Sequence, residues 1–390
     1  MAKPRLLSLD VFRGFNILVM IVVNCCGPGS FTQLQHSAWN GCTLTDLVFP
    51  FFLFISGVSI AFSSRLDSGG SRLDLVPSIL RRAATIFVIG LLINAFPYYR
   101  LATWRIPGVL QRIALCYLFG SLLYLFASAR TRWVTIAGLL IGYWILMRYV
   151  PVPGFGVPTV DIPLLDPNRN WVAWLDRKLM MGHLYEKVRD PEGLLSTLPA
   201  LANILFGVAA GEWVRELRTQ IPCISHSKSK SGLPESCRPD APCLLRRLLW
   251  LGAACATGGL LWGLEFPINK KLWTSSYVLL TAGLAMITLA ACYWLLDVKQ
   301  FRGRWTVVPL VFGTNCIFAY AFSEFFAIWL VVHKLRIDGH AMNYKTAFNY
   351  YTFDNIPWPQ WSSLAYALFY TALCWMVTWL LYRKRIFIKV

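Results

Sequence analysis

Long apolar runs separated by short polar loops alternate along almost the whole chain of 390 residues. Several runs approach about 20 residues, the length that an α-helix needs to cross a hydrocarbon core of about 30 Å. The pattern predicts an all-α polytopic membrane protein with about ten transmembrane helices. The predicted spans are residues 7–26, 43–63, 79–96, 107–127, 133–150, 197–214, 248–264, 275–296, 306–332 and 363–382.

Composition and charge agree with this pattern. Hydrophobic residues make up 56% of the chain and charged residues 14%, whereas soluble domains carry roughly 25% charged residues. The net charge of +18 is compatible with a nucleic-acid partner, but Lys and Arg gather in the short loops between apolar runs, as membrane topology requires. We therefore expect a lipid bilayer, and no nucleic acid, as a partner. An N-in, C-in topology puts most of the 37 Lys and Arg residues on the cytoplasmic side.

A stretch rich in Ser, Lys, Pro and Arg, residues 215–247, has the composition of a flexible linker and falls on the cytoplasmic side. It divides the chain into a six-helix part, residues 1–214, and a four-helix part, residues 248–390. We interpret the two parts as one integral membrane domain, with the candidate chemistry in the first part.

That chemistry lies between the first two predicted spans. Asn24 ends the first apolar run, His36 lies in a short polar loop, and Asp46 begins the second run. Histidine is the commonest general acid or base, but a loop histidine at a membrane surface is also a common solvated residue. Asp46 either starts its helix, where the dipole favours a carboxylate, or orients His36. The residues alone leave both alternatives open.

Charged residues within other spans are expected to face the bundle interior or a wet cavity. Asp10 and Arg13 lie three positions apart on one helical face, which favours a structural ion pair. The sequence identifies no partner for Arg112 or Glu324. The basic turn at residues 269–271 is interpreted as an interfacial anchor.

Familiar catalytic motifs are missing from the sequence. It contains no Gly-rich phosphate loop, Cys-x-x-Cys pair, G-x-S-x-G elbow or His-Glu-x-x-His zinc helix, and we expect no metal. An enzyme, a secondary transporter of a polar solute and a non-enzymatic membrane protein all fit the residues so far. No internal repeat, which a transporter would usually show, is evident.

Six stretches, in order, resemble successive blocks of the heparan-α-glucosaminide N-acetyltransferase family of transmembrane acyltransferases. They are LLSLDVFRGFNILVMIVVN, QHSAWNGCTLTDLVFPFFLFISG, RIPGVLQRIALCY, DPEGLLSTLPA, NKKLWTSSYVL and GTNCIFAY. The resemblance implies transfer of an acetyl group from cytoplasmic acetyl-CoA to the amino group of a glucosamine-type sugar on the far side of the membrane. Acetyl-CoA is then a donor substrate.

The resemblance also assigns residues. His36 matches the family's active-site histidine, and Asn24 matches the asparagine that ends the first span. We add Asp46, from the same block, as the third catalytic residue. The expected substrate-binding residues, from the H-x-x-W-N-G and D-P-E-G blocks, are Trp39, Asn40, Asp190 and Glu192.

Basic residues expected on the cytoplasmic face are our predicted binding groups for the CoA phosphates, because guanidinium groups pair well with phosphate. They are Arg13, Arg81 and Arg82. The alternative is that they act as topology signals alone.

Two mechanisms fit these residues. His36 acts either as a general base or as a carrier of the acetyl group. Asn24 is expected to donate its side-chain amide to the oxyanion, and Asp46 or Asn40 to fix the imidazole tautomer.

The cellular setting follows from departures from the animal members. The chain lacks their long lumenal N-terminal region and has no N-x-Ser/Thr acceptor. We therefore expect a multi-pass protein of the bacterial inner membrane, with a lysosomal membrane as the alternative and a cell-wall amino sugar as the acceptor. A homodimer is left as an open alternative.

Overall fold

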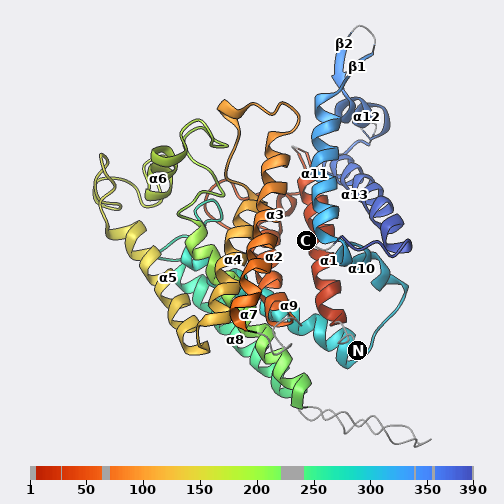
Figure 1. The fold of residues 1–390 in the computed structure, drawn as a ribbon. Coiled ribbons are helices and arrows are strands. Elements are labelled where there is room, and N and C mark those ends of the chain that lie inside the picture. Colours follow the sequence, from red (N-terminus) through yellow and green to blue (C-terminus); the bar gives the residue numbers. More distant parts are fainter. Residues whose placement is uncertain are drawn as a thin grey trace, which may run out of the picture.

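The computed structural model describes residues 6–27, 29–63, 71–220, 241–337, 340–353 and 356–388. It is a bundle of long helices with one small hairpin (Figure 1). The long helices are α1 (Leu7–Cys25), α2 (Leu44–Ala61), α3 (Val76–Ala95), α4 (Val109–Phe126), α5 (Ala129–Tyr149), α7 (Thr197–Gln220), α8 (Ala241–Trp262), α9 (Ser275–Tyr293), α11 (Cys316–Val332) and α13 (Pro359–Arg383). The shorter elements are α6 (Trp171–Met180), α10 (Val307–Thr314), α12 (Tyr344–Thr352) and the antiparallel strands β1 (Lys334–Ile337) and β2 (His340–Asn343).

The predicted all-α membrane class is confirmed. In the described part of the chain, eight helices are long and apolar enough to cross a membrane, and nine are if α10 and α11 form one broken span. The fifth predicted span, residues 133–150, is helical, but α5 carries Arg130, Arg132 and Arg148 within its 21 residues. With these charges, α5 is not among the eight helices that are apolar enough to span a membrane.

The ninth predicted span, residues 306–332, is bent by 79° between α10 and α11. Asn315 lies at the break and is buried. Its amide donates to the Ile386 carbonyl at 3.1 Å, and its oxygen accepts from the Ile388 amide at 2.9 Å. The polar side chain therefore ties the break to the C-terminal tail, a contact that the local apolar pattern does not reveal.

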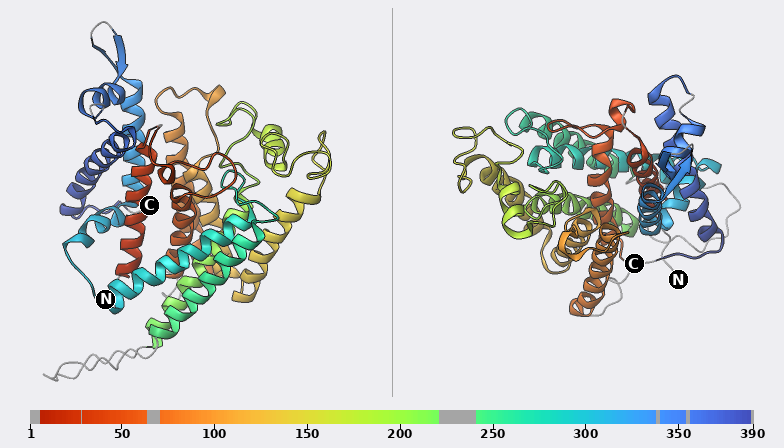
Figure 2. Two further views of the ribbon diagram at one scale, coloured as in Figure 1. Left: turned by 180° about the vertical axis from the view of Figure 1, so that it is seen from behind. Right: turned by 90° about the horizontal axis from the view of Figure 1, so that it is seen from above.

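The two predicted membrane parts pack into one core. A single buried cluster combines Phe54 of α2, Leu205 of α7 and Met286 of α9. Helices α7 and α8 reach into the predicted linker 215–247, up to Gln220 and from Ala241. Its remaining residues, 221–240, lie outside the described residues. Viewed from above, α11, α12 and α13 form one flank, and α5 and α6 lie on the opposite flank (Figure 2).

Connections sort to two ends of the bundle. The loops after α1, α5, α8 and α11 lie at one end, together with α6 and the hairpin (Figure 1). The end that faces the cytoplasm is still a prediction, based on the distribution of Lys and Arg.

Glycines bring α2 into backbone contact with α7. A Cβ atom added at Gly57 would meet the carbonyl group of Ile204, and one added at Gly207 would meet that of Phe54. Small residues allow this close approach of helices in a membrane. The contact fixes the helix that begins with the predicted catalytic carboxylate.

Replacing Gly207 with Leu should therefore destabilise the protein by at least about 1–3 kcal/mol, the usual cost of overpacking. The matched control is Gly138→Leu on α5, where an added Cβ meets no atom within 4 Å. Thermal unfolding in detergent, followed by tryptophan fluorescence, measures both variants. Equal unfolding midpoints would contradict the close packing of α2 on α7.

Candidate active site

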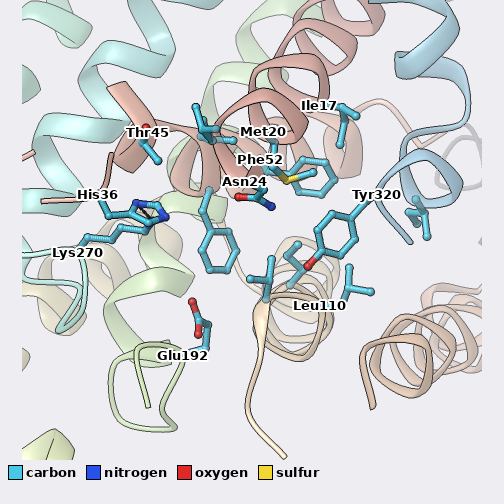
Figure 3. A pocket seen from close by; sticks show the side chains of 16 residues that line it. Ile17, Met20, Asn24, His36, Thr45, Phe52, Leu110, Glu192, Lys270 and Tyr320 are labelled. Carbon is cyan, nitrogen blue, oxygen red and sulfur yellow. Dashed lines mark hydrogen bonds between the residues drawn. The ribbon is translucent and has the colours of Figure 1, made fainter. Parts of the chain in front are cut away.

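A pocket lies between α1, α2, α4 and α11, beside the loop that carries His36 (Figure 3). Most of its wall is apolar and includes Phe49, Phe52 and Leu110. Polar side chains reach it from three loops and three helices. They are Asn24, His36, Thr45, Glu192 and Lys270, with Tyr320 at the α11 side. Such a wall, apolar with a few polar groups, is typical of a small-molecule site.

Asp46 holds both the start of α2 and the imidazole of His36. One carboxylate oxygen, Oδ2, accepts hydrogen bonds at 3.1 Å from the backbone amides of Ser37 and Thr43 and from the Thr43 hydroxyl. The other, Oδ1, lies 2.8 Å from His36 Nδ1. Asp46 is buried and His36 is half exposed, with 51% of its side chain accessible. Because a carboxylate only accepts hydrogen bonds, the contact with Asp46 favours the tautomer in which Nδ1 carries the proton and Nε2 keeps its lone pair.

Lys270 completes this cluster, and sequence reasoning missed it. Its Nζ lies 2.9 Å from His36 Nδ1, 3.4 Å from Nε2 and 3.4 Å from Asp46 Oδ1. The expected interfacial anchor is thus a pocket residue. Burial lowers the pKa of Lys270, and the negative charges of Asp46 and Glu192 oppose that shift. The available signal was its place in the NKKLW block.

The turn around Lys270 is fastened to the His36 loop. The Asn269 amide donates to Asn40 Oδ1 at 3.1 Å, and the Gly41 amide donates to the Ile268 carbonyl at 2.7 Å. Asn40 therefore contacts Asn269 and not the imidazole. Of the two groups expected to fix the tautomer, Asp46 is the one in contact with His36.

The Asn24 side chain lies across the pocket and is bonded to α11. Its Nδ2 donates to Glu324 Oε1 at 3.0 Å. This contact supplies the partner for Glu324 that the sequence could not identify, because the two residues are 300 positions apart.

Two arginines, the half-buried Arg105 and the buried Arg112, hold the D-P-E-G loop. Arg105 donates to both oxygens of Asp190, at 2.8 and 2.6 Å, and to Glu192 at 2.5 Å. Burial raises the pKa of Asp190, but the hydrogen bonds and charge of Arg105 outweigh it, so the net shift is downward. Glu192 lines the pocket, whereas Asp190 lies behind it.

Arg112 anchors the same loop from α4. Its guanidinium donates to the carbonyls of Pro191 and Gly193, both at 3.1 Å, and to the Ser196 hydroxyl. It also lies 4.8 Å from the ring centroid of Trp273. Arg112 is therefore a structural residue that holds the D-P-E-G loop against the start of α4.

Trp39 also connects loops and lies outside the pocket wall. Its indole donates to the Leu165 carbonyl at 3.0 Å, and the Arg189 guanidinium stacks 4.3 Å from its ring. Trp39, Asn40 and Asp190 are thus near the site without lining the pocket, while Glu192 does line it. Their predicted roles in substrate binding stay predictions.

The three arginines predicted for CoA binding lie away from this pocket wall. Arg13 pairs with Asp10 at 3.2 Å, which confirms the predicted ion pair, and donates to the Ser59 hydroxyl at 2.8 Å. Arg81 and Arg82 are exposed on α3, and Arg82 lies 4.8 Å from the Tyr117 ring.

A metal site was not found among the described residues, where no three His, Cys, Asp or Glu side chains are grouped to hold an ion.

Removing Arg105 should leave Asp190 as a buried carboxylate without its ion pair, although the backbone amides of Tyr185 and Glu192 still donate to it. Arg105→Leu is therefore expected to cost about 3–5 kcal/mol, whereas Arg148→Leu, which breaks a partly exposed pair with Glu265, should cost about 1 kcal/mol or less. Because Arg105 lowers the pKa of Asp190, the penalty is present above the ordinary Asp pKa of about 3.9 and is lost as the pH falls below it. Unfolding midpoints measured at neutral and acid pH check this, and an equal penalty for both variants would contradict it.

Comparison with known proteins agrees with the blocks noted in the sequence. The family model described as "Heparan-alpha-glucosaminide N-acetyltransferase, catalytic" matches residues 5–233. The human heparan-alpha-glucosaminide N-acetyltransferase is 31% identical, and the mouse protein 29%, each over 99% of this chain. The chain spans 60% of the length of these two relatives. The resemblance is confirmed, and the chain belongs to the heparan-alpha-glucosaminide N-acetyltransferase family.

Proposed function

We propose that the protein is a transmembrane N-acetyltransferase that passes the acetyl group of acetyl-CoA to the amino group of a glucosamine-type sugar. The observation that carries this proposal is the contact between His36 Nδ1 and Asp46 Oδ1, at 2.8 Å, on the wall of a pocket. It gives an oriented base next to a space for substrates. The human and mouse relatives are named heparan-alpha-glucosaminide N-acetyltransferases, which supports transfer of an acetyl group to a glucosamine nitrogen.

The reaction needs a deprotonated amine. In the direct route, His36 Nε2 takes a proton from the amine as its nitrogen attacks the thioester carbon. The carbon–sulfur bond then breaks, and the proton passes to the departing CoA thiolate. A positioned base of this kind contributes typically about 10²–10⁴-fold. In the alternative ping-pong route, His36 carries the acetyl group before the amine attacks.

Lys270 is the second contributor. Its ammonium group lines the pocket beside His36, so negative charge that develops on the thioester oxygen has a cation close by. A well-placed donor to an oxyanion is worth on the order of 10²–10³-fold. Glu192, opposite and anchored by Arg105, offers a carboxylate to the hydroxyl or ammonium groups of the sugar.

Sidedness is the finer part of the proposal. The distribution of Lys and Arg favours a topology with the His36 end on the far side of the membrane, and we propose that acetyl-CoA binds from the cytoplasm. Arg13 is already bonded to Asp10 and Ser59. The exposed Arg81 and Arg82 are therefore the freer groups for CoA phosphates. The bacterial inner membrane is the proposed location, and the lysosomal membrane is the alternative.

A secondary transporter is the competing function, because the span α10–α11 is broken by 79° and broken helices often line transport sites. Counterflow of radiolabelled glucosamine into proteoliposomes, without acetylation, would identify it.

The base is tested by His36→Ala. Amine-dependent release of CoA from acetyl-CoA should fall by about 10²–10⁴-fold, because the proton acceptor is gone. Asp46→Asn should also lower the rate, because the asparagine amide can both donate and accept and so no longer imposes one tautomer on His36. His333→Ala, an exposed histidine outside the pocket, should keep the wild-type rate. Equal rates for wild type and a folded His36→Ala variant would remove His36 from the mechanism.

The cation is tested by a neighbouring pair of lysines. Lys270→Met should lower kcat by about 10²-fold, while Lys271→Met, whose ammonium faces Glu186, should change it less than a few-fold. Steady-state kinetics with glucosamine gives both values. Similar losses in the two variants would show that general positive charge matters, and not the place of Lys270.

A further inference from the structure

Glu324 is a carboxyl group that the mechanism above leaves unused. It lies on α11, inside the broken span, where ionisable side chains are costly and usually functional. Within the described ranges it forms no ion pair, and Asn24 is the side-chain hydrogen-bond partner of its carboxylate. The presence of this ionisable group within a span therefore needs an explanation other than a salt bridge.

Helical spacing puts Glu324 on the face of α11 that borders the pocket. Ile317 and Tyr320 line the pocket, and Glu324 follows Tyr320 by four positions, so all three share one face of α11. On α1, Met20 and Asn24 line the pocket with the same spacing. Asn24 and Glu324 thus meet where α1 and α11 approach each other at the pocket.

The bond to Glu324 decides which end of the Asn24 amide faces the pocket. An asparagine amide has a donor nitrogen on one side and an acceptor oxygen on the other. Because Nδ2 donates to Glu324, Oδ1 turns the other way. In Figure 3 the Asn24 oxygen lies on the side of His36, and its nitrogen lies on the side of Tyr320.

An oxygen in this place suits an amine and not an oxyanion. An oxyanion has no hydrogen to donate and is repelled by a carbonyl oxygen. A primary amine has two N–H groups, and one can be given up to His36 while the other donates to Asn24 Oδ1. A hydroxyl group has a single hydrogen and cannot serve both residues.

We propose that Glu324 is a positioning residue that turns the Asn24 carbonyl oxygen towards the acceptor amine, and that this oxygen selects amines over hydroxyl groups. The inference rests on the proposed acetyltransferase function. In the transfer step, one amine proton moves to His36, the nitrogen–carbon bond forms, and the carbon–sulfur bond to CoA breaks. The second N–H of the amine stays hydrogen-bonded to Asn24 Oδ1 and remains in the amide product. Lys270 then faces the oxyanion, in place of the Asn24 amide expected from the sequence.

The test is steady-state kinetics of the full chain in detergent, with glucosamine and acetyl-CoA each varied at a saturating level of the other. Asn24→Ala and Glu324→Leu should each raise the KM for glucosamine about tenfold, the loss expected for one hydrogen bond, with the KM for acetyl-CoA unchanged. Glu324→Gln keeps an acceptor oxygen and should recover most of the loss. The double variant should be no worse than Asn24→Ala alone, because both changes remove one interaction.

Glu212→Gln is the matched control, because Glu212 is another carboxylate on a membrane helix, paired with Arg132 away from the pocket. It should leave the KM for glucosamine unchanged even if the unfolding midpoint falls. Should Glu324→Leu not fold, Asn24→Ala, Glu324→Gln and their double variant give the same comparison.

Three results would overturn the proposal: an unchanged KM for glucosamine in folded Glu324→Leu, equal increases in both KM values, or losses that multiply in the double variant. Wild-type protein that releases no CoA with any amine would instead overturn the proposed function itself.

Discussion

The site depends on the buried carboxylate of Asp46, which contacts both the start of α2 and the imidazole of His36. One oxygen of Asp46 accepts hydrogen bonds from the backbone amides of Ser37 and Thr43 and from the Thr43 hydroxyl, at the start of α2. The other oxygen contacts the imidazole of His36. A residue in the first turn of a helix is held as rigidly as the helix itself. Because Asp46 is held in this way, its contact also fixes the imidazole of His36. The contact of α2 with α7 through Gly57 and Gly207 extends the same constraint into the centre of the bundle.

Around this fixed carboxylate, distant segments contribute one polar group each. The loop before α9 brings Lys270, the D-P-E-G loop brings Glu192, and the last turn of α1 brings Asn24. Each of these groups has its own supporting residue: Asn269 for the first, Arg105 for the second and Glu324 for the third. A polar site inside an apolar bundle is stable because nearly every polar group in it is paired.

The family resemblance drew attention to Asn24, His36 and Asp46, which lie in two neighbouring blocks and whose catalytic roles stay predictions. Local patterns in the sequence were enough to predict the helices. They were not enough for Lys270, whose contact with His36 joins residues 234 positions apart. The same holds for Glu324 and for the break at Asn315, since their partners come from other parts of the chain. Side chains that act through long-range contacts leave no periodic signal, so composition assigned Lys270 to the membrane surface.

The state of the His36 ring is the central claim, and nitrogen NMR of protein labelled with ¹⁵N-histidine measures it directly. The chain has five histidines, so a spectrum of His36→Ala identifies the signals of His36 by difference. The account predicts a protonated Nδ1 and an unprotonated Nε2 in wild type, because Asp46 accepts from Nδ1. A protonated Nε2 with a bare Nδ1 would contradict it, since Lys270 would then be the donor to Nδ1 and His36 would lack the lone pair that takes the proton.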